Sequence, residues 1–143
     1  MEFKKIHLYG SDIEDYEVLS ALIQDAAIPT SEMKFDKVEK QFFLVCSRFS
    51  WESRLQNKGN KRIVSGICFD NVIKVKKKNF PSFNSENILN FLTLKKERGF
   101  IELIFSNNIL IKLVGNNISF RIDDLNKEWP TIFSPNHKKL DDE

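Results

Sequence analysis

The chain has 143 residues, of which 41% are apolar and 29% charged, and a formal net charge of +2. This length predicts one domain whose core needs no disulfide or metal for stability, and the charge is too small by itself to indicate a nucleic-acid partner. Two cysteines do not form a disulfide framework. The N-terminus has no apolar stretch typical of a signal peptide, and no run reaches the roughly 18 apolar residues of a membrane-spanning helix. We therefore expect a soluble, reduced, cytoplasmic protein.

The N-terminal third predicts a short strand over residues 3–9 followed by one amphipathic helix. Ser11 and Glu14 have the spacing of a capping box. Apolar residues then recur at helical intervals: Tyr16, Leu19, Ile23 and Ala26. Pro29 closes this segment. Asp25 would lie in the last turn, where an acid opposes the helix dipole, so we expect it to have a partner.

The most apolar run of the chain is residues 41–52, after a short predicted strand at 32–35. Read with period two, one face carries Phe43, Val45 and Phe49, and the other carries Phe42, Leu44 and Cys46. Both faces are apolar, which predicts a central strand covered on both sides.

Two hairpins are predicted further along the chain. In the first, Asp70-Asn71 forms a tight turn that folds residues 72–78 back on 62–69. In the second, Asn107-Asn108 joins residues 100–105 to 109–114. Alternation continues at residues 118–122, whereas residues 53–61 and 79–86 are predicted loops.

Residues 87–97 fit either a helix capped by Ser85 or a strand that begins near Leu89, and we favour the strand. The connections after the helix are too short for crossovers, so the sheet should be mostly antiparallel. The prediction is a single α+β domain over residues 1–128, with a polar C-terminal tail at 129–143. Its sheet should be a curled sheet or partial barrel of about seven or eight strands, with one N-terminal amphipathic helix.

Few residues suggest catalysis. The chain has only His7 and His137, and no His/Cys cluster has metal-ligand spacing, so we expect neither a metal nor a cofactor. Cys46 and Cys68 could face each other on neighbouring strands, but a reactive thiol needs a base and an electropositive, partly open site. Both are better interpreted as buried and inert, which ranks an enzyme that uses a cysteine thiol last.

Three polar or aromatic residues follow closely where the central strand ends: Arg48, Trp51 and Glu52. They bring a guanidinium, an indole and a carboxylate together. The guanidinium and the indole can bind an anion or stack on a planar ligand. The structural alternative is a lock, in which Trp51 covers the edge of the core and Arg48 pairs with Glu52 or Asp25. We favour the lock.

Lysines alternate in residues 72–78, which places Lys74, Lys76 and Lys78 on one face of the strand. This face could hold the phosphates of a nucleic acid or of a lipid head group. The alternative is an edge strand that lysines protect from pairing with other chains. We favour the protected edge, because the segment lacks the aromatic platform of nucleic-acid binders.

Four segments resemble a small alphaproteobacterial family, domain-of-unknown-function family 2948: IQDA at 23–26, SRFSWE at 47–52, FDNVIKV at 69–75 and WPTIFSPNH at 129–137. The resemblance covers nearly the whole chain in the same order. Ser47 departs from it, because the family usually has Asn there. The family has no assigned activity, so the resemblance implies a free-standing bacterial cytoplasmic protein and no catalytic residue.

These observations favour a small non-enzymatic binding or adaptor domain with a site around Asp25, Arg48, Trp51 and Glu52. Its partner would be a protein or small molecule, and no membrane is expected. The alternative is phosphate or nucleic-acid binding through Lys74, Lys76 and Lys78.

Overall fold

The computed structural model describes residues 5–50, 62–81 and 87–125. These residues form one α-helix, one short 3-10 helix and ten strands. In chain order the elements are β1 (His7–Gly10), α1 (Ile13–Leu22), β2 (Ala27–Pro29), η1 (Thr30–Glu32), β3 (Met33–Asp36), β4 (Gln41–Phe49), β5 (Arg62–Asp70), β6 (Lys74–Lys78), β7 (Ile88–Glu97), β8 (Phe100–Phe105), β9 (Leu110–Val114) and β10 (Ser119–Asp124). No helix in this part of the chain is long and apolar enough to cross a membrane.

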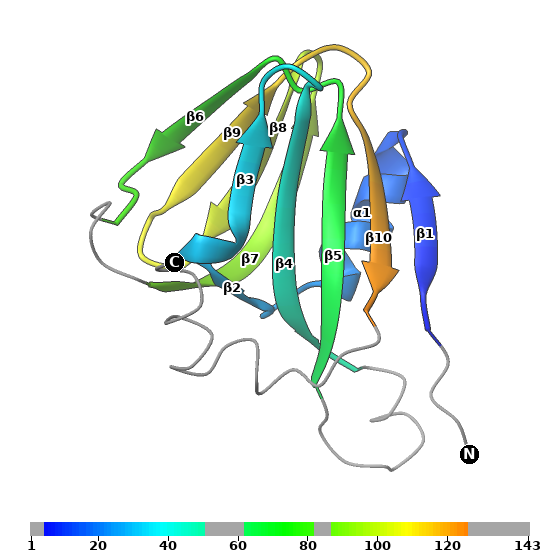
Figure 1. The fold of residues 1–143 in the computed structure, drawn as a ribbon, viewed down its shortest axis with the longest axis vertical. Helices are drawn as coiled ribbons and strands as arrows, with labels where there is room; N and C mark the ends of the chain where they lie inside the picture. Colours follow the sequence, from blue (N-terminus) through cyan, green and yellow to red (C-terminus); the bar gives the residue numbers. More distant parts are fainter. Residues whose placement is uncertain (1–4, 51–61, 82–86, 126–143) are drawn as a thin grey trace.

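All ten strands belong to one antiparallel sheet with the order β1-β10-β5-β4-β2-β7-β8-β9-β6, and β3 also pairs with β4. The sheet is curled and open, and α1 lies behind β5 and β10 (Figure 1). The predicted α+β class is confirmed, with ten strands in place of seven or eight. The sequence does not reveal β2, because it is only three residues long and ends at a proline that predicts the end of a helix.

The core lies inside the curl of the sheet. Alternate residues of β4 point into it, among them Phe42 and Leu44, which are paired with Phe69 and Ile67 of β5. The other face of β4 is not fully covered, since Phe43 is 36% exposed. The prediction of a strand covered on both sides is therefore wrong at Phe43, because one face of an antiparallel sheet can contact water.

The N-cap of helix α1 lies one residue later than predicted. Asp12 is the N-cap, and its carboxylate accepts the Asp15 N–H at 2.8 Å. The Asp15 carboxylate accepts the N–H groups of Ser11 at 2.9 Å and Asp12 at 3.2 Å. This capping box holds the pKa of Asp15 below its ordinary value. The expected Ser11–Glu14 box is wrong, because Asp12 and Asp15, one residue further on, form the capping box instead.

The helix ends at Leu22, before Asp25 is reached. Asp25 has a φ of 64° and donates its N–H to the carbonyl of Phe91 at 2.9 Å, and the Phe91 N–H donates to the carbonyl of Ala26 at 2.9 Å. Aspartate is among the few residue types that tolerate this left-handed conformation. The expected position of Asp25 in the last helical turn is therefore wrong, and its backbone joins α1 to β7.

The strand after the Asp70-Asn71 turn does not return to β5. Val72 is fully buried and donates its N–H to the carbonyl of Lys40 at 2.9 Å, and Ile73 donates to the carbonyl of Val114 at 2.8 Å. The bond from Ile73 leads directly into the pairing of β6 with β9. The predicted hairpin of β5 and β6 is wrong, whereas the hairpin of β8 and β9 and the strand at β7 are confirmed.

Gly115 packs directly against the backbone of Asn71. A Cβ atom at this position would lie 2.0 Å from the Asn71 carbonyl oxygen. Gly115→Ala should therefore lower the free energy of unfolding by about 1–3 kcal/mol, the usual cost of overpacking. A urea melt measures this change. Gly66→Ala is the control, because its Cβ would meet only Leu125 side-chain atoms at 3.8 Å. Equal midpoints for the two variants would contradict the prediction.

Candidate functional site

Arg48 is fully buried and forms an ion pair with Asp124 of β10. Its Nη2 lies 2.8 Å from Asp124 Oδ2, and its Nε donates to Asp124 Oδ1 at 3.2 Å. The Ser65 hydroxyl donates to the same Oδ1 at 2.6 Å, and Arg48 Nη1 donates to the Phe49 carbonyl at 3.1 Å. The pairing of β5 with both β4 and β10 brings these groups together. A two-bond contact of this kind fits a planar guanidinium and a carboxylate.

This geometry supports a structural role for Arg48, with Asp124 as a partner that was not predicted. Asp25 is exposed, and no ion pair joins its side chain to Arg48 among the described residues. Trp51 and Glu52 lie outside the described residues, so the role of Trp51 in covering the edge of the core and the pairing of Arg48 with Glu52 stay predictions. Binding of a partner at this cluster also stays a prediction.

The two cysteines lie on opposite faces of the sheet. Cys46 is paired with Ser65 and points into the core, where burial raises the pKa of its thiol to about 12. Cys68 is paired with Phe43 on the outer face. Desolvation raises the pKa of Cys68, opposed by a hydrogen bond from Arg121 Nη2 at 3.2 Å. Neither arrangement activates a thiol, because activation requires a lowered pKa. Among the described residues, no three His, Cys, Asp or Glu side chains form a metal-binding group.

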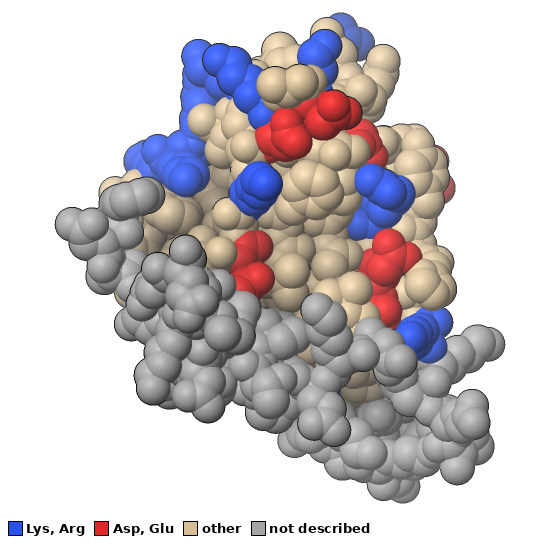
Figure 2. Space-filling view, viewed as in Figure 1, with Lys and Arg blue, Asp and Glu red and all other residues tan. Residues whose placement is uncertain are grey.

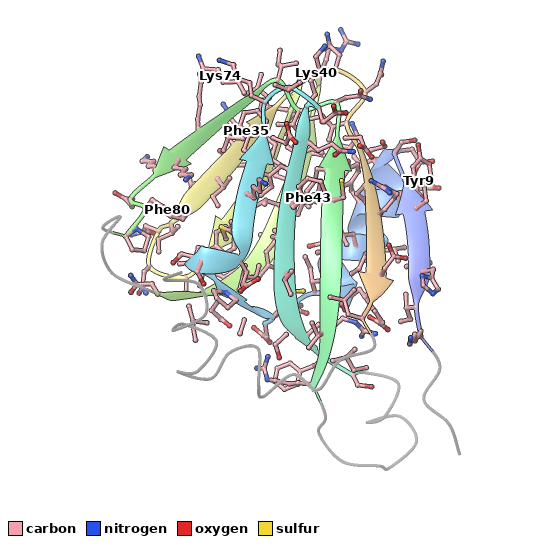
Figure 3. All side chains as sticks on the ribbon, viewed as in Figure 1. Tyr9, Phe35, Lys40, Phe43, Lys74 and Phe80 are labelled. Atoms are coloured by element: carbon pink, nitrogen blue, oxygen red, sulfur yellow. The ribbon has the colours of Figure 1, made fainter. Side chains whose placement is uncertain are left out.

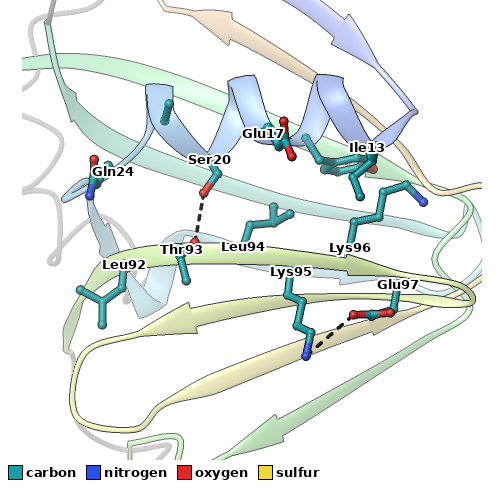
Figure 4. Close-up of a pocket in the computed structure, with 12 residues that line it drawn as sticks. Ile13, Glu17, Ser20, Gln24, Leu92, Thr93, Leu94, Lys95, Lys96 and Glu97 are labelled. Carbon is teal, nitrogen blue, oxygen red and sulfur yellow. Dashed lines mark hydrogen bonds and ion pairs between the residues drawn. The ribbon is translucent and has the colours of Figure 1, made fainter.

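A groove of about 570 Å³ runs between α1 and β7 (Figure 4). Ser20 and Thr93 meet across it at 3.4 Å through their hydroxyl oxygens. Its lining is mixed, with the acidic Glu17 on the helix, Gln24 just after the helix and the basic Lys96 on the strand. Lys95 and Glu97 point away from the helix and pair with each other at 3.8 Å. This mixed lining matches no single class of ligand.

The strongest concentration of one charge is on β6 and β9. Lys74, Lys76 and Lys78 alternate with Val75, which packs against the core, so the three lysines point outward. The register of β6 and β9 places Lys112 directly opposite Lys76. These four residues, Lys74, Lys76, Lys78 and Lys112, are named the lysine face. Basic side chains gather along the β6 side of the molecule (Figure 2), where Lys74 projects from the start of the strand (Figure 3).

No lysine of this face forms an ion pair with a described residue. Lys112 instead lies over the ring of Phe100 of β8, with Nζ 4.2 Å from the ring centroid, and Lys77 lies over Phe80 at 4.5 Å. Phe100 is opposite Val114 of β9 and opposite Glu97 of β7, so its half-buried ring is on the same outward face. Lys112 and Phe100 were not predicted to lie here, because only strand pairing brings them beside β6.

A family model described as "Protein of unknown function (DUF2948)" matches residues 6–137. No curated protein and no solved structure matches the chain.

Proposed function

The chain belongs to this family of proteins of unknown function, and we propose that it is a non-enzymatic binding module that holds a single-stranded nucleic acid across its lysine face. The observation that carries the proposal is the direct cross-strand pairing of Lys76 with Lys112. Like charges directly opposite each other in a sheet are destabilising. A bound phosphate between the two ammonium groups would convert this repulsion into attraction.

Edge protection accounts for only part of the lysine face. It explains Lys74, Lys76 and Lys78, because β6 is the last strand of the sheet. It does not explain Lys112, because β9 lies between β6 and β8 and has no free edge. Lys112 has Glu102 of β8 directly opposite it on its other side, so a charge pair accounts for part of its placement. The contact that a bound phosphate would relieve is the one with Lys76.

The spacing of the lysine face suits a phosphate backbone. Alternate residues of a strand lie roughly 6.6–6.8 Å apart, so Lys74, Lys76 and Lys78 form an evenly spaced row. The half-buried ring of Phe100 lies one strand beyond Lys112. An aromatic ring beside a basic row is the combination by which single-stranded nucleic acids are bound without strong sequence preference. An extended strand of RNA or DNA fits this arrangement better than an isolated phosphate.

The test is fluorescence anisotropy of a labelled single-stranded oligonucleotide titrated with the protein at several salt concentrations. Four phosphate contacts predict a slope of about −3 in a plot of log affinity against log salt, since each contact to a single strand contributes roughly −0.7. Lys112→Gln should make the slope shallower by about 0.7. Lys74→Glu with Lys76→Glu should abolish binding at physiological salt while the melting temperature stays nearly unchanged, because exposed charges contribute little to stability.

The matched control is Lys34→Glu with Lys37→Glu. These two lysines are exposed on β3 and in the turn that follows it, and the change in net charge is the same. The control should retain most of the binding of the parent. Absence of binding by the parent, or equal loss in both double variants, would refute the proposal.

A further inference from the structure

The two ends of the sheet differ in how their free edges are protected. At one end, β6 carries four lysines in five residues, Lys74 and Lys76–Lys78. At the other end is β1, with the sequence HLYG and no lysine. Natural sheets discourage edge-to-edge pairing with lysine, proline or a bulge. Within His7–Gly10 the structure has none of these devices.

The outward backbone groups on this edge have no strand partner among the residues that the structure describes. Asp124 donates its N–H to the carbonyl of Ile6, so Ile6, Leu8 and Gly10 are the residues that bond to β10, because bonded residues alternate in an antiparallel pair. The N–H and C=O groups of His7 and Tyr9 therefore point away from the sheet. No described residue other than those of β10 pairs with β1.

Apolar side chains border the same edge. Leu8 is 39% exposed and Tyr9 is 67% exposed, and Figure 3 shows Tyr9 at this end of the sheet. Asp15 of α1 packs against Gly10, and Val18, three residues later on the same flank of the helix, is 55% exposed. A strand added at this edge would cover apolar surface and satisfy free backbone groups at once.

We infer that β1 is the interface of a symmetric homodimer, in which β1 of a second copy of this chain adds antiparallel to it. The register that uses the free groups places Leu8 opposite Leu8 of the second copy. His7 then exchanges two backbone hydrogen bonds with Tyr9 of the second copy, and the symmetry repeats this pair. Four hydrogen bonds form, two exposed leucines cover each other, and no like charges are opposed within the strand. This self-complementarity favours a second copy over an unrelated peptide as the occupant.

The dimer lies at the opposite end of the sheet from the lysine face, so it goes beyond the proposed function and does not depend on it. The test is sedimentation velocity of the full chain from micromolar to millimolar concentration. The parent should shift from monomer to dimer. Leu8→Lys should remain a monomer throughout, because two ammonium groups would meet across the symmetry axis. Tyr9→Pro should also remain a monomer, because it removes an N–H that points outward.

Ile88→Lys is the control, since Ile88 of β7 is an exposed apolar residue, at 61%, that does not belong to β1. It should dimerise like the parent. Should Tyr9→Pro fail to fold, Leu8→Lys still decides the matter, because the Leu8 side chain is already partly in water. A parent that stays monomeric at all concentrations, or a Leu8→Lys variant that dimerises like the parent, would overturn the inference.

Discussion

Arg48→Met is expected to lower the free energy of unfolding by about 3–5 kcal/mol, because it leaves the buried Asp124 carboxylate without its countercharge. Arg48 is 0% exposed and Asp124 is 3% exposed, so water cannot replace the guanidinium. Total stability of a domain is about 5–15 kcal/mol, and the variant should therefore be close to unfolding at growth temperature. Urea melts of the parent and the variant give the difference in midpoint.

Two further variants separate the charge from the loss of packing. Arg48→Met combined with Asp124→Leu should regain much of the lost stability, since an apolar pair of similar volume often replaces a buried ion pair at little cost. Arg121→Met should cost little, because its side chain is 48% exposed and its contact to Asp70 is 3.5 Å long. A midpoint of Arg48→Met equal to that of Arg121→Met would show that the buried pair does not stabilise the fold.

Local alternation was sufficient to predict most strands. The β8–β9 hairpin follows from two apolar alternating runs around Asn107 and Asn108, whose φ values of 64° and 61° suit a tight turn. Pairing between distant segments was not predictable in the same way. β6 follows β5 in the chain, yet it pairs with β9, beginning beside the bond from the Ile73 N–H to the Val114 carbonyl. Pairing between segments this far apart leaves no pattern in the sequence.

For the candidate sites too, features within one strand could be predicted, whereas contacts between distant strands could not. The outward row of Lys74, Lys76 and Lys78 could be predicted, because it depends only on alternation within one strand. Lys112 and Phe100 could not be predicted to lie beside this row, because the pairing of β6 with β9 and of β9 with β8 places them there. Likewise, the sequence predicts that Arg48 needs a carboxylate near the core, but its partner Asp124 lies 76 residues away. A carboxylate as near in sequence as Glu52 is the natural expectation when only local spacing is known.

Alkaline pH should destabilise the fold through Cys46. Burial raises the pKa of this thiol from 9.0 to about 12, so the folded chain keeps a proton that the unfolded chain releases. Below pH 9 both states hold the proton, and the contribution to stability is fully present. Between about pH 9 and pH 12 the unfolded state binds fewer protons, and stability should fall by about 1.4 kcal/mol per pH unit. Burial also raises the pKa of Tyr16 above its ordinary value of 10.0, which adds a second loss in the same direction at higher pH.

Cys46→Ala isolates the contribution of the thiol. Urea melts of the parent and of Cys46→Ala should be compared at neutral pH and at steps above pH 9. At neutral pH the variant should be less stable, because the removed sulfur leaves a small cavity in the core. As pH rises past 9, the variant should lose stability more slowly than the parent, so that the two curves converge. Tyr16, whose hydroxyl donates to the Ile118 carbonyl at 2.7 Å in both proteins, should cause the loss that remains in the variant. Parallel curves across this pH range would contradict the prediction, because the Cys46 thiol would then titrate alike in the folded and unfolded chains.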